Sequence, residues 1–392
     1  MVTTIKWTFE GRVVAMNFDL DEIQKMLHKD AQRFLSEKSP KDYVRKMEED
    51  ERGYSTELWK EMANLGWIGL VLPEKYGGQG MTFMELAVLL EEMGRACLPG
   101  PYFSTVMLGG LPVLEAGTEE QKQEFLPKIA AGETLVTLAL TEPSARYDPL
   151  GVEVKATADG DNYIIKGTKL FVPDAHVADY IICVTRTRDT ADKSQGISLF
   201  IVDAGSTGIR HRLLRTIASD RQCEVVFDKV AVPRENLLGE LNQGWKLVEK
   251  TLQRAAAAKC AEMIGGAEQV LEMTVAYAKE RVQFGRPIGS FQAVQHHCAN
   301  MASDLEASRF ITYRACWMVS QNLPCDKEVS MAKAWVSDAY RRIVSLGHQI
   351  HGGVGFTKDH DMQLYYRRAK GGELLFGDAD YHREKVAELL SI

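Results

Sequence analysis

The chain has 392 residues, of which 45% are hydrophobic and 26% are charged, and this length is enough for two or three domains with separate cores. Its net charge of −7 argues against a nucleic-acid-binding surface. No apolar run approaches the ~20 residues that a membrane helix needs, so membrane insertion is not expected. The seven cysteines are scattered without a Cys-x-x-Cys pair, which favours reduced thiols in a cytoplasmic protein over a disulfide or zinc framework.

The N-terminal third has the spacing of a helical domain. From Asp21 to Leu35 the apolar residues recur every three or four positions, and Asp19 or Asp21 can cap this helix. Further segments have the same pattern, at residues 58–65, 83–93 and 119–129. Glycine- and proline-rich runs separate them. We therefore expect a helical domain over residues 16–134, preceded by an extension or leader over residues 1–15.

The pattern changes near Thr134 to that of a β-domain. Alternation over Val152–Ala158 predicts a strand, Asp159-Gly160 predicts a hairpin turn, and the chain resumes as a strand at Tyr163. Further strands are expected at residues 180–184, 197–202 and 223–232. These short segments predict a small β-domain over residues 135–241.

From Gln243 onward the helical period returns and continues to the end of the chain. The expected long helices are Trp245–Arg281, Phe291–Asn322, Cys325–Ile350 and Met362–Leu390. Long helices with short connections are typical of an antiparallel four-helix bundle. We therefore predict a C-terminal bundle over residues 242–392.

Four motifs within these domains have the residue types of a ligand site. Leu138–Ser144 contains Thr-Glu-Pro, and Ile165–Pro173 contains an aromatic residue at Phe171. Taken singly, a capped strand end and a buried phenylalanine are the more ordinary interpretations of these two. Ala278–Gln292 places an arginine near a glycine turn, and the planar donors of arginine match a pyrophosphate. Gly347–Thr357 has three glycines directly after a helix, where a plain helix end needs one.

With these motifs in this domain order, the chain resembles the acyl-CoA dehydrogenase family from about Asn17 to its C-terminus. The resemblance implies an α+β fold, with an N-terminal helical domain, a central small β-barrel or sandwich, and a C-terminal four-helix bundle. It also implies an FAD-dependent oxidoreductase of acyl-CoA metabolism that is tetrameric and passes electrons to an electron-transferring flavoprotein. The adjacent pair His296-His297 cannot share a helix face, so no metal site is expected.

The resemblance assigns site residues one by one. FAD contacts are implied for Leu138, Leu140, Thr141, Phe171, Val172, Arg281, Phe284, Gln292, Gln349, Gly352, Gly353 and Asp378. Arg281 and Gln349 would complete the cofactor site of a neighbouring subunit, and Arg254, Phe376 and Gly377 would contact the acyl-CoA substrate. The chain departs from the family at Pro173, where a threonine is usual, and at Ser144–Asp148, where the family has Gly-x-Gly-Ser-Asp.

The catalytic base of the family is missing. In much of the family a Tyr-Glu-Gly-Thr run supplies the glutamate that removes the α-proton of the substrate, and Phe376 stands at that position here. Other members place the glutamate on the first bundle helix, where this chain has Ala255 and Ala256. The backbone N–H at Phe376 can still polarise the thioester carbonyl, but its side chain cannot accept a proton.

Three explanations remain open from the sequence. The base is a relocated carboxylate, or a homologous partner subunit of a heterotetramer supplies it, or the reaction has changed, for example to a desulfination. The candidate carboxylates are Glu91, Glu92, Asp148, Glu373 and Asp378, although structural or surface roles are the ordinary ones for such residues. We expect an acyl-CoA dehydrogenase with an unusual base, as a homotetramer or a heterotetramer.

Overall fold

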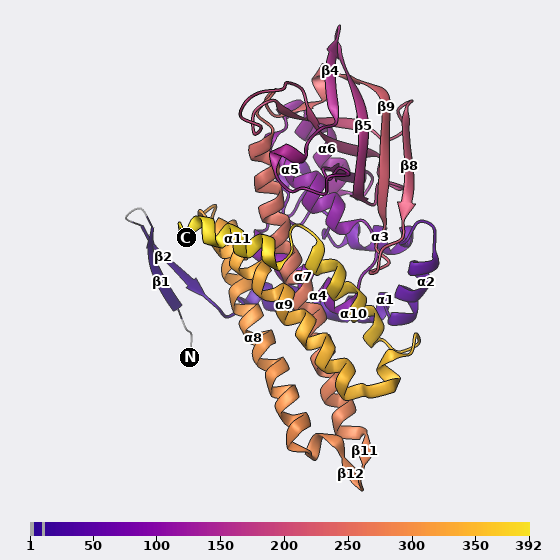
Figure 1. Ribbon diagram of the computed structural model, residues 1–392, viewed down its shortest axis with the longest axis vertical. Coiled ribbons are helices and arrows are strands. Elements are labelled where there is room, and N and C mark those ends of the chain that lie inside the picture. The colour runs from indigo at the N-terminus through magenta and orange to yellow at the C-terminus, as the bar shows by residue number, and fades with distance from the viewer. Residues whose placement is uncertain (1–3, 10–11) are drawn as a thin grey trace. The chain divides into compact units, whose positions relative to one another are not determined.

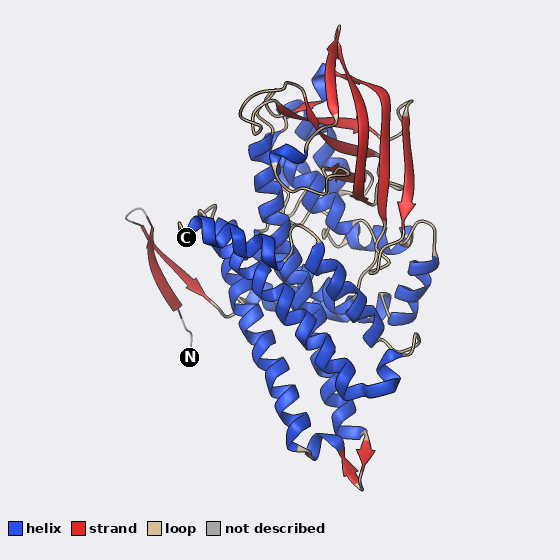
Figure 2. Ribbon diagram, viewed as in Figure 1, coloured by secondary structure: helices blue, strands red, loops and turns tan. Residues whose placement is uncertain are grey.

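The computed structural model describes residues 4–9 and 12–392, which form two compact units. One unit contains the described residues up to Arg45 together with Thr82–Leu98 and Ala256–Ile392, and the other contains Lys46–Met81 and Pro99–Ala255. The first is mostly helical, and the second combines a sheet with helices (Figures 1 and 2). Each unit therefore draws on segments that are distant in the sequence.

Capping residues define where the helices of the first unit begin. Helix α1 (Glu22–Lys38) starts at Asp21, whose side chain accepts a hydrogen bond from the backbone N–H of Gln24. The Gln24 side chain in turn accepts from the backbone N–H of Asp21. Helix α4 (Phe83–Ala96) starts with the same reciprocal arrangement between Thr82 and Glu85. This pattern satisfies N–H groups that would otherwise lack partners in the first turn. Both helices were predicted from their apolar spacing.

Helix α4 crosses helix α7 (Trp245–Glu280) at two glycines. A Cβ atom at Gly94 would lie 1.8 Å from the carbonyl oxygen of Glu262, and one at Gly265 would lie 1.7 Å from that of Glu91. No side chain fits within such distances, so the two backbones touch directly. The crossing fixes α4, which carries Glu91, against α7.

Helix α9 is the centre of the C-terminal bundle and packs against three others, namely α8 (Gln292–Ser320), α10 (Met362–Leu374) and α11 (Ala379–Leu389). Helix α9 itself spans Asp326–His351, and its buried face includes Ala332, Val336 and Ile343. The figure shows α8, α9 and α10 as long neighbouring helices (Figure 1). Three of the predicted bundle segments are confirmed with small shifts of their ends.

The predicted single helix over Met362–Leu390 is wrong, because the chain breaks between α10 and α11. Phe376 has φ 61° and Gly377 has φ 96°, and neither value continues a right-handed helix. Asp378 then starts α11, since its side chain accepts from the backbone N–H of Tyr381 at 2.9 Å. A Cβ at Gly377 would lie 2.3 Å from the Tyr381 ring, so this turn requires glycine. The position of the expected base thus lies in a loop.

The second unit contains an eight-stranded sheet in the order β10-β7-β6-β4-β5-β9-β8, with β3 pairing in parallel with β6. Its strands are β3 (Val136–Ala139), β4 (Lys155–Asp159), β5 (Asn162–Pro173), β6 (Tyr180–Arg186), β7 (Ile197–Asp203), β8 (Ile209–Leu214), β9 (Gln222–Pro233) and β10 (Leu237–Leu238). Ile165, Phe200 and Phe227 are buried in its core. The predicted hairpin is confirmed, because Asp159 lies opposite Asn162. Strand β8 was missed because its apolar residues do not alternate and most of its residues are exposed at the sheet edge.

Several shorter helices and strands lie between these elements. The helices are α2 (Lys41–Glu49), α3 (Thr56–Asn64), a π-helical segment η2 (Ser104–Gly110), α5 (Leu111–Ala116) and α6 (Glu119–Ala130). The strands β1 (Thr4–Phe9) and β2 (Arg12–Asn17) pair antiparallel, and β11 (Val282–Gln283) pairs with β12 (Arg286–Pro287). Within residues 4–9 and 12–392, no helix combines the length and apolarity required to cross a membrane.

Candidate functional site

A buried ion pair joins the Thr-Glu-Pro segment to strand β5 in the second unit. The side chain of Lys169 is fully buried, and its Nζ donates to the carbonyl oxygen of Leu140 at 3.0 Å and to Glu142 Oε1 at 2.7 Å. The Glu142 carboxylate also accepts from the backbone N–H groups of Glu153 and Val154. Burying two charges is tolerable when they are paired and hydrogen-bonded to further groups, and here the lysine also binds a carbonyl oxygen while the carboxylate also accepts two backbone N–H groups. The pair holds the backbone around Thr141 in place.

Phe171 projects from a bulge in β5 close to this segment. The register of β5 against β9 shifts between Lys169 and Val172, and Phe171 lies in the shift with φ 54° and 47% exposure. The neighbouring backbone N–H of Leu170 donates to the carbonyl oxygen of Thr141 at 2.8 Å. A bulge re-aims a side chain at the cost of local strain. The sheet therefore brings the two predicted flavin motifs together, with the aromatic ring directed outward.

The other predicted residues of these two motifs belong to the core. Leu138, Leu140 and Val172 are buried, so only their main-chain groups can meet a ligand. Thr141 is half-buried. A ligand at this edge would therefore contact the backbone of β3 and its extension, the Thr141 side chain and the Phe171 ring.

In the first unit the Arg281 motif is displayed on the hairpin between α7 and α8 (Figure 1). Arg281 and Gln292 are exposed, Phe284 is 92% exposed with φ 52°, and the Arg286 guanidinium lies 4.2 Å from the Phe291 ring centre. Among the residues that the structure describes, the guanidinium group of Arg281 has no partner. The side chains of Arg281 and Phe284 on this hairpin are therefore accessible to a ligand or to another molecule.

The glycine motif forms the end of α9. Gly352 has φ 62° and ψ −142°, a combination that only glycine adopts readily. A Cβ at Gly352 or Gly353 would have no other atom within 4 Å, so packing explains neither glycine. Gln349 is exposed beside them, while burial lowers the pKa of His348 and His351 on the inner side of the helix. Gln349 and Gly353 are therefore exposed, and Gly352 between them is partly exposed.

The loop that carries Phe376 is held by two residues that the sequence analysis missed. Lys333 of α9 is fully buried, and its Nζ donates to the carbonyl oxygens of Glu373 at 3.0 Å and Gly377 at 2.8 Å. His382 Nε2 lies 2.9 Å from the carbonyl oxygen of Phe376, which can only accept, so this nitrogen carries the proton. Burial lowers the pKa of Lys333 to about 8 and that of His382 to about 4. The charged lysine within the apolar run Met331–Val336 was the available signal.

Glu91 and Glu92, the two candidate bases on α4, are buried in the first unit. Glu91 accepts from Tyr313 at 2.5 Å and from Arg309 at 3.2 Å, and burial raises its pKa despite these contacts. Glu92 lies 2.9 Å from His28 Nε2, and that contact raises the pKa of the histidine.

The other candidate carboxylates also have structural partners. Asp148 pairs with Arg146 at 2.6 Å, and Glu373 pairs with Lys370 at 2.9 Å. Asp378 caps α11 through the N–H of Tyr381. Use of any of the five carboxylates as a base would therefore disturb an existing contact.

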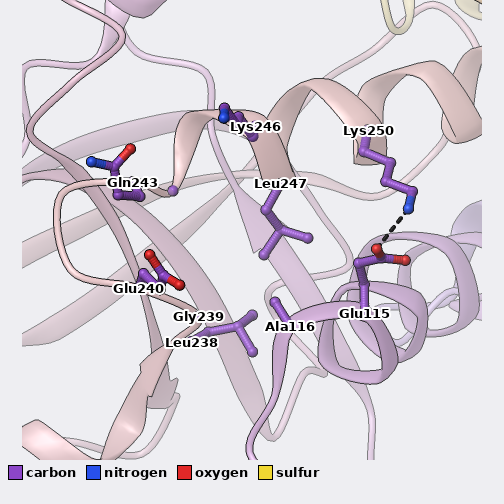
Figure 3. Close-up of a pocket in the computed structure, with 10 residues that line it drawn as sticks. Glu115, Ala116, Leu238, Gly239, Glu240, Gln243, Lys246, Leu247 and Lys250 are labelled. Atoms are coloured by element: carbon purple, nitrogen blue, oxygen red, sulfur yellow. Dashed lines mark hydrogen bonds and ion pairs between the residues drawn. The ribbon is translucent and has the colours of Figure 1, made fainter.

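A pocket of roughly 480 Å³ lies in the second unit beside the start of α7 (Figure 3). Leu238, Leu247 and Ala116 provide apolar walls, and Glu115 stands at one side. Burial alone would raise the pKa of Glu115, but hydrogen bonds and charge from Lys250 at 2.6 Å and Arg254 at 3.1 Å lower it. Arg254, a predicted substrate contact, thus adjoins this pocket. Glu115 was missed because its partners are distant in the sequence.

Three family models match the chain, and their descriptions are the N-terminal, middle and C-terminal domains of acyl-CoA dehydrogenase, at residues 21–133, 137–230 and 242–391. A probable acyl-CoA dehydrogenase of Bacillus subtilis is 34% identical over 96% of this chain and 100% of its own length. A subunit of the caffeyl-CoA reductase–Etf complex of Acetobacterium woodii is 32% identical over 94% and 98%. The ChsE4-ChsE5 complex from Mycobacterium tuberculosis contains a chain with TM-score 0.87 and 26% identity, covering 96% and 99%.

Replacing Lys169 with methionine should lower the free energy of unfolding by about 3 kcal/mol, because Glu142 would be left as a buried charge without its partner. Denaturant unfolding followed by tryptophan fluorescence measures this change. Lys166→Met, on the exposed side of the same strand, is the matched control and should shift stability by less than about 0.5 kcal/mol. Equal stability of the two variants would contradict the role given to the ion pair.

Stability should depend on His382 in mild acid. Its pKa is held near 4 by burial, below the ordinary value, so the unfolded chain binds a proton that the folded chain excludes. The free energy of unfolding therefore decreases by about 2 kcal/mol as the pH falls from about 7 to about 4.5. His382→Gln keeps an amide donor without titrating, so its loss over this range should be smaller by that amount. An equal loss of unfolding free energy in the two proteins between these pH values would refute this.

Proposed function

Since the chain belongs to the acyl-CoA dehydrogenase family, we propose that it takes part in the α,β-dehydrogenation of an acyl-CoA thioester. It is an FAD-dependent oxidoreductase that acts on acyl-CoA, as its relatives are. Electrons would pass to an electron-transferring flavoprotein, a proposal supported by the relative named as part of an Etf complex. The domain limits proposed are residues 16–134, 135–241 and 242–392, after an extension over residues 1–15.

The residues at the predicted cofactor positions fit FAD. Phe171 offers an exposed ring beside Thr141, Arg281 offers a guanidinium group without a partner among the described residues, and Gly352-Gly353 offers open backbone. Bound FAD supplies the acceptor for the hydride that leaves the β-carbon of the substrate. The residues proposed to hold it are Leu138, Leu140, Thr141, Phe171, Val172, Arg281, Phe284, Gln292, Gln349, Gly352, Gly353 and Asp378. The arginine and glycine groups would serve a neighbouring subunit, which supports a tetramer.

We propose that Phe376 and Gly377 meet the thioester, with Arg254 contacting the substrate from α7. The backbone N–H of Phe376 would donate to the thioester carbonyl and acidify the α-proton. The Phe376 side chain has no group that accepts a proton, so the base must come from elsewhere. The proposal of an unusual base is supported by this single observation, a phenylalanine in the loop between α10 and α11 where the resemblance implies a glutamate.

A second function is favoured by the contacts of the five candidate carboxylates. Glu91, Glu92, Asp148, Glu373 and Asp378 all have structural partners, which speaks against a relocated base. The chain would then be a non-catalytic or half-active subunit of a heterotetramer whose homologous partner carries the glutamate. The similarity to a chain of the ChsE4-ChsE5 complex supports a mixed assembly. A changed reaction such as desulfination is the remaining alternative.

The seven free cysteines support a cytoplasmic location, where thiols stay reduced. An anaerobic titration of the purified protein with a panel of acyl-CoA thioesters tests the function. Bleaching of the flavin would identify an autonomous dehydrogenase. Bound FAD without bleaching for any thioester would favour the partner-dependent subunit, and a preparation that binds no FAD would refute both.

Restoring a carboxylate at the base position should restore proton abstraction. Phe376→Glu should bleach the flavin with an acyl-CoA about 100-fold faster than Phe376→Gln, because a positioned base contributes about that much and the amide cannot accept the proton. Stopped-flow absorbance under anaerobic conditions measures both rates. The glutamine variant is matched in size, so equal rates in the two variants would show that position 376 does not face the α-carbon.

Loss of the proposed pyrophosphate contact should weaken FAD binding. Arg281→Ala removes a charge-assisted hydrogen bond, which corresponds to about tenfold or greater weakening. Flavin absorbance relative to protein absorbance, after dialysis, reports the occupancy. Lys279→Ala, also exposed on the last turn of α7, is the control and should keep its flavin. Full retention of flavin by the Arg281 variant would contradict the assignment.

A further inference from the structure

One stripe of α9 faces the loop between α10 and α11. Ser330, Lys333 and Ser337 lie on it, all of them buried, and Lys333 is the charged member. The ammonium group has three donors, and three acceptors surround it, namely the carbonyl oxygens of Glu373 at 3.0 Å and Gly377 at 2.8 Å and Ser337 Oγ at 3.2 Å. Every donor of this buried cation is therefore used, and two of the three bonds go to the last turn of α10 and to the loop that follows it.

His382 holds the same loop from the side of α11. Its Nε2 donates to the carbonyl oxygen of Phe376 at 2.9 Å, and its Nδ1 lies 3.3 Å from Ser330 Oγ on the α9 stripe. The carbonyls of two consecutive residues, Phe376 and Gly377, are thus bound by His382 and Lys333. These are also the two residues with left-handed backbone, at φ 61° and 96°. The contacts fix the backbone from outside the loop, independently of the side chain at position 376.

Helix packing alone does not explain a lysine here. Its neighbours on the buried face, Ala332, Ala334 and Val336, show that small apolar residues suit this helix. A buried charge is expensive unless its bonds secure something else. Neither nearby carboxylate neutralises it by contact, because the Glu373 carboxylate bonds to Lys370 and that of Asp378 caps α11. The ammonium group is therefore bound by neutral oxygen atoms. Its hydrogen bonds fix the backbone and do not neutralise a carboxylate.

We propose that Lys333, together with His382, is a positioning residue for the thioester. It holds the Phe376–Gly377 backbone in the one conformation that meets the thioester carbonyl, whichever side chain occupies position 376. The inference rests on the proposed function and adds to it the means by which carbonyl polarisation survives the loss of the glutamate. Lys333 itself acts through the loop and need not touch the substrate.

Difference infrared spectroscopy of the FAD-loaded protein tests this, with an acyl-CoA that is isotopically labelled at the thioester carbonyl. The wild-type protein should shift the carbonyl band to lower wavenumber than in solution. Lys333→Met should lose most of that shift and bind the thioester about tenfold more weakly, with its flavin content unchanged. Lys327→Met, exposed on the same helix, should match the wild type. A full wild-type shift in the Lys333 variant would overturn the proposal.

Two variants of His382 test the proposal if Lys333→Met does not fold. His382→Gln retains a donor for the Phe376 carbonyl and should keep most of the band shift, whereas His382→Leu should lose it. Equal shifts in these two variants would overturn the positioning role. If the wild-type protein itself binds no thioester or leaves the carbonyl band unshifted, the proposed function fails and this inference fails with it. A wild-type shift that no variant alters defeats this inference alone.

Discussion

Each unit contains a fully buried lysine that binds main-chain carbonyl oxygens beside a predicted site segment. Lys169 binds the carbonyl of Leu140 in the sheet unit, and Lys333 binds those of Glu373 and Gly377 in the helical unit. The two are satisfied differently, because Lys169 also has the carboxylate of Glu142 whereas Lys333 has only neutral acceptors. An ammonium group can join several carbonyls that point in different directions, which no apolar side chain can do. Irregular backbone next to a ligand site needs such a partner, since it has no ladder or helix to satisfy it.

Backbone strain falls on the same segments. Phe171, Phe284 and Phe376 have φ of 54°, 52° and 61°, values that are unfavourable for a bulky side chain. All three are positions that the family resemblance assigns to cofactor or substrate. Strain of this kind persists only where surrounding contacts over-determine the backbone. Lys169 lies two residues before Phe171, and Lys333 binds the carbonyl oxygen of Gly377, directly after Phe376. At Phe171 and Phe376, a buried cation and a strained phenylalanine are therefore parts of one arrangement in each unit.

Periodicity was sufficient to predict most helices and the main strands, because one face of each is buried in its own unit. It failed at the break after α10, where Leu374, Leu375 and Phe376 continue an apolar run without a proline. The loop depends on Lys333, more than forty positions earlier, and no local pattern reports such a contact. Strand β8 was missed for the opposite reason, since an edge strand buries little. The site residues were predicted from the family resemblance. The pairing of Glu115 with Lys250 was predicted neither from periodicity nor from the resemblance.

Position 376 can serve two tasks that are physically separable. A backbone N–H that polarises a carbonyl depends on φ, ψ and the contacts of the loop, whereas proton abstraction depends on the side chain alone. Lys333 and His382 bind carbonyl oxygens and would hold the loop equally well for glutamate or phenylalanine. Under the proposed function, a phenylalanine in place of the glutamate therefore removes proton abstraction and leaves the backbone N–H in place. Such a subunit would bind and polarise a thioester while another group supplied the base.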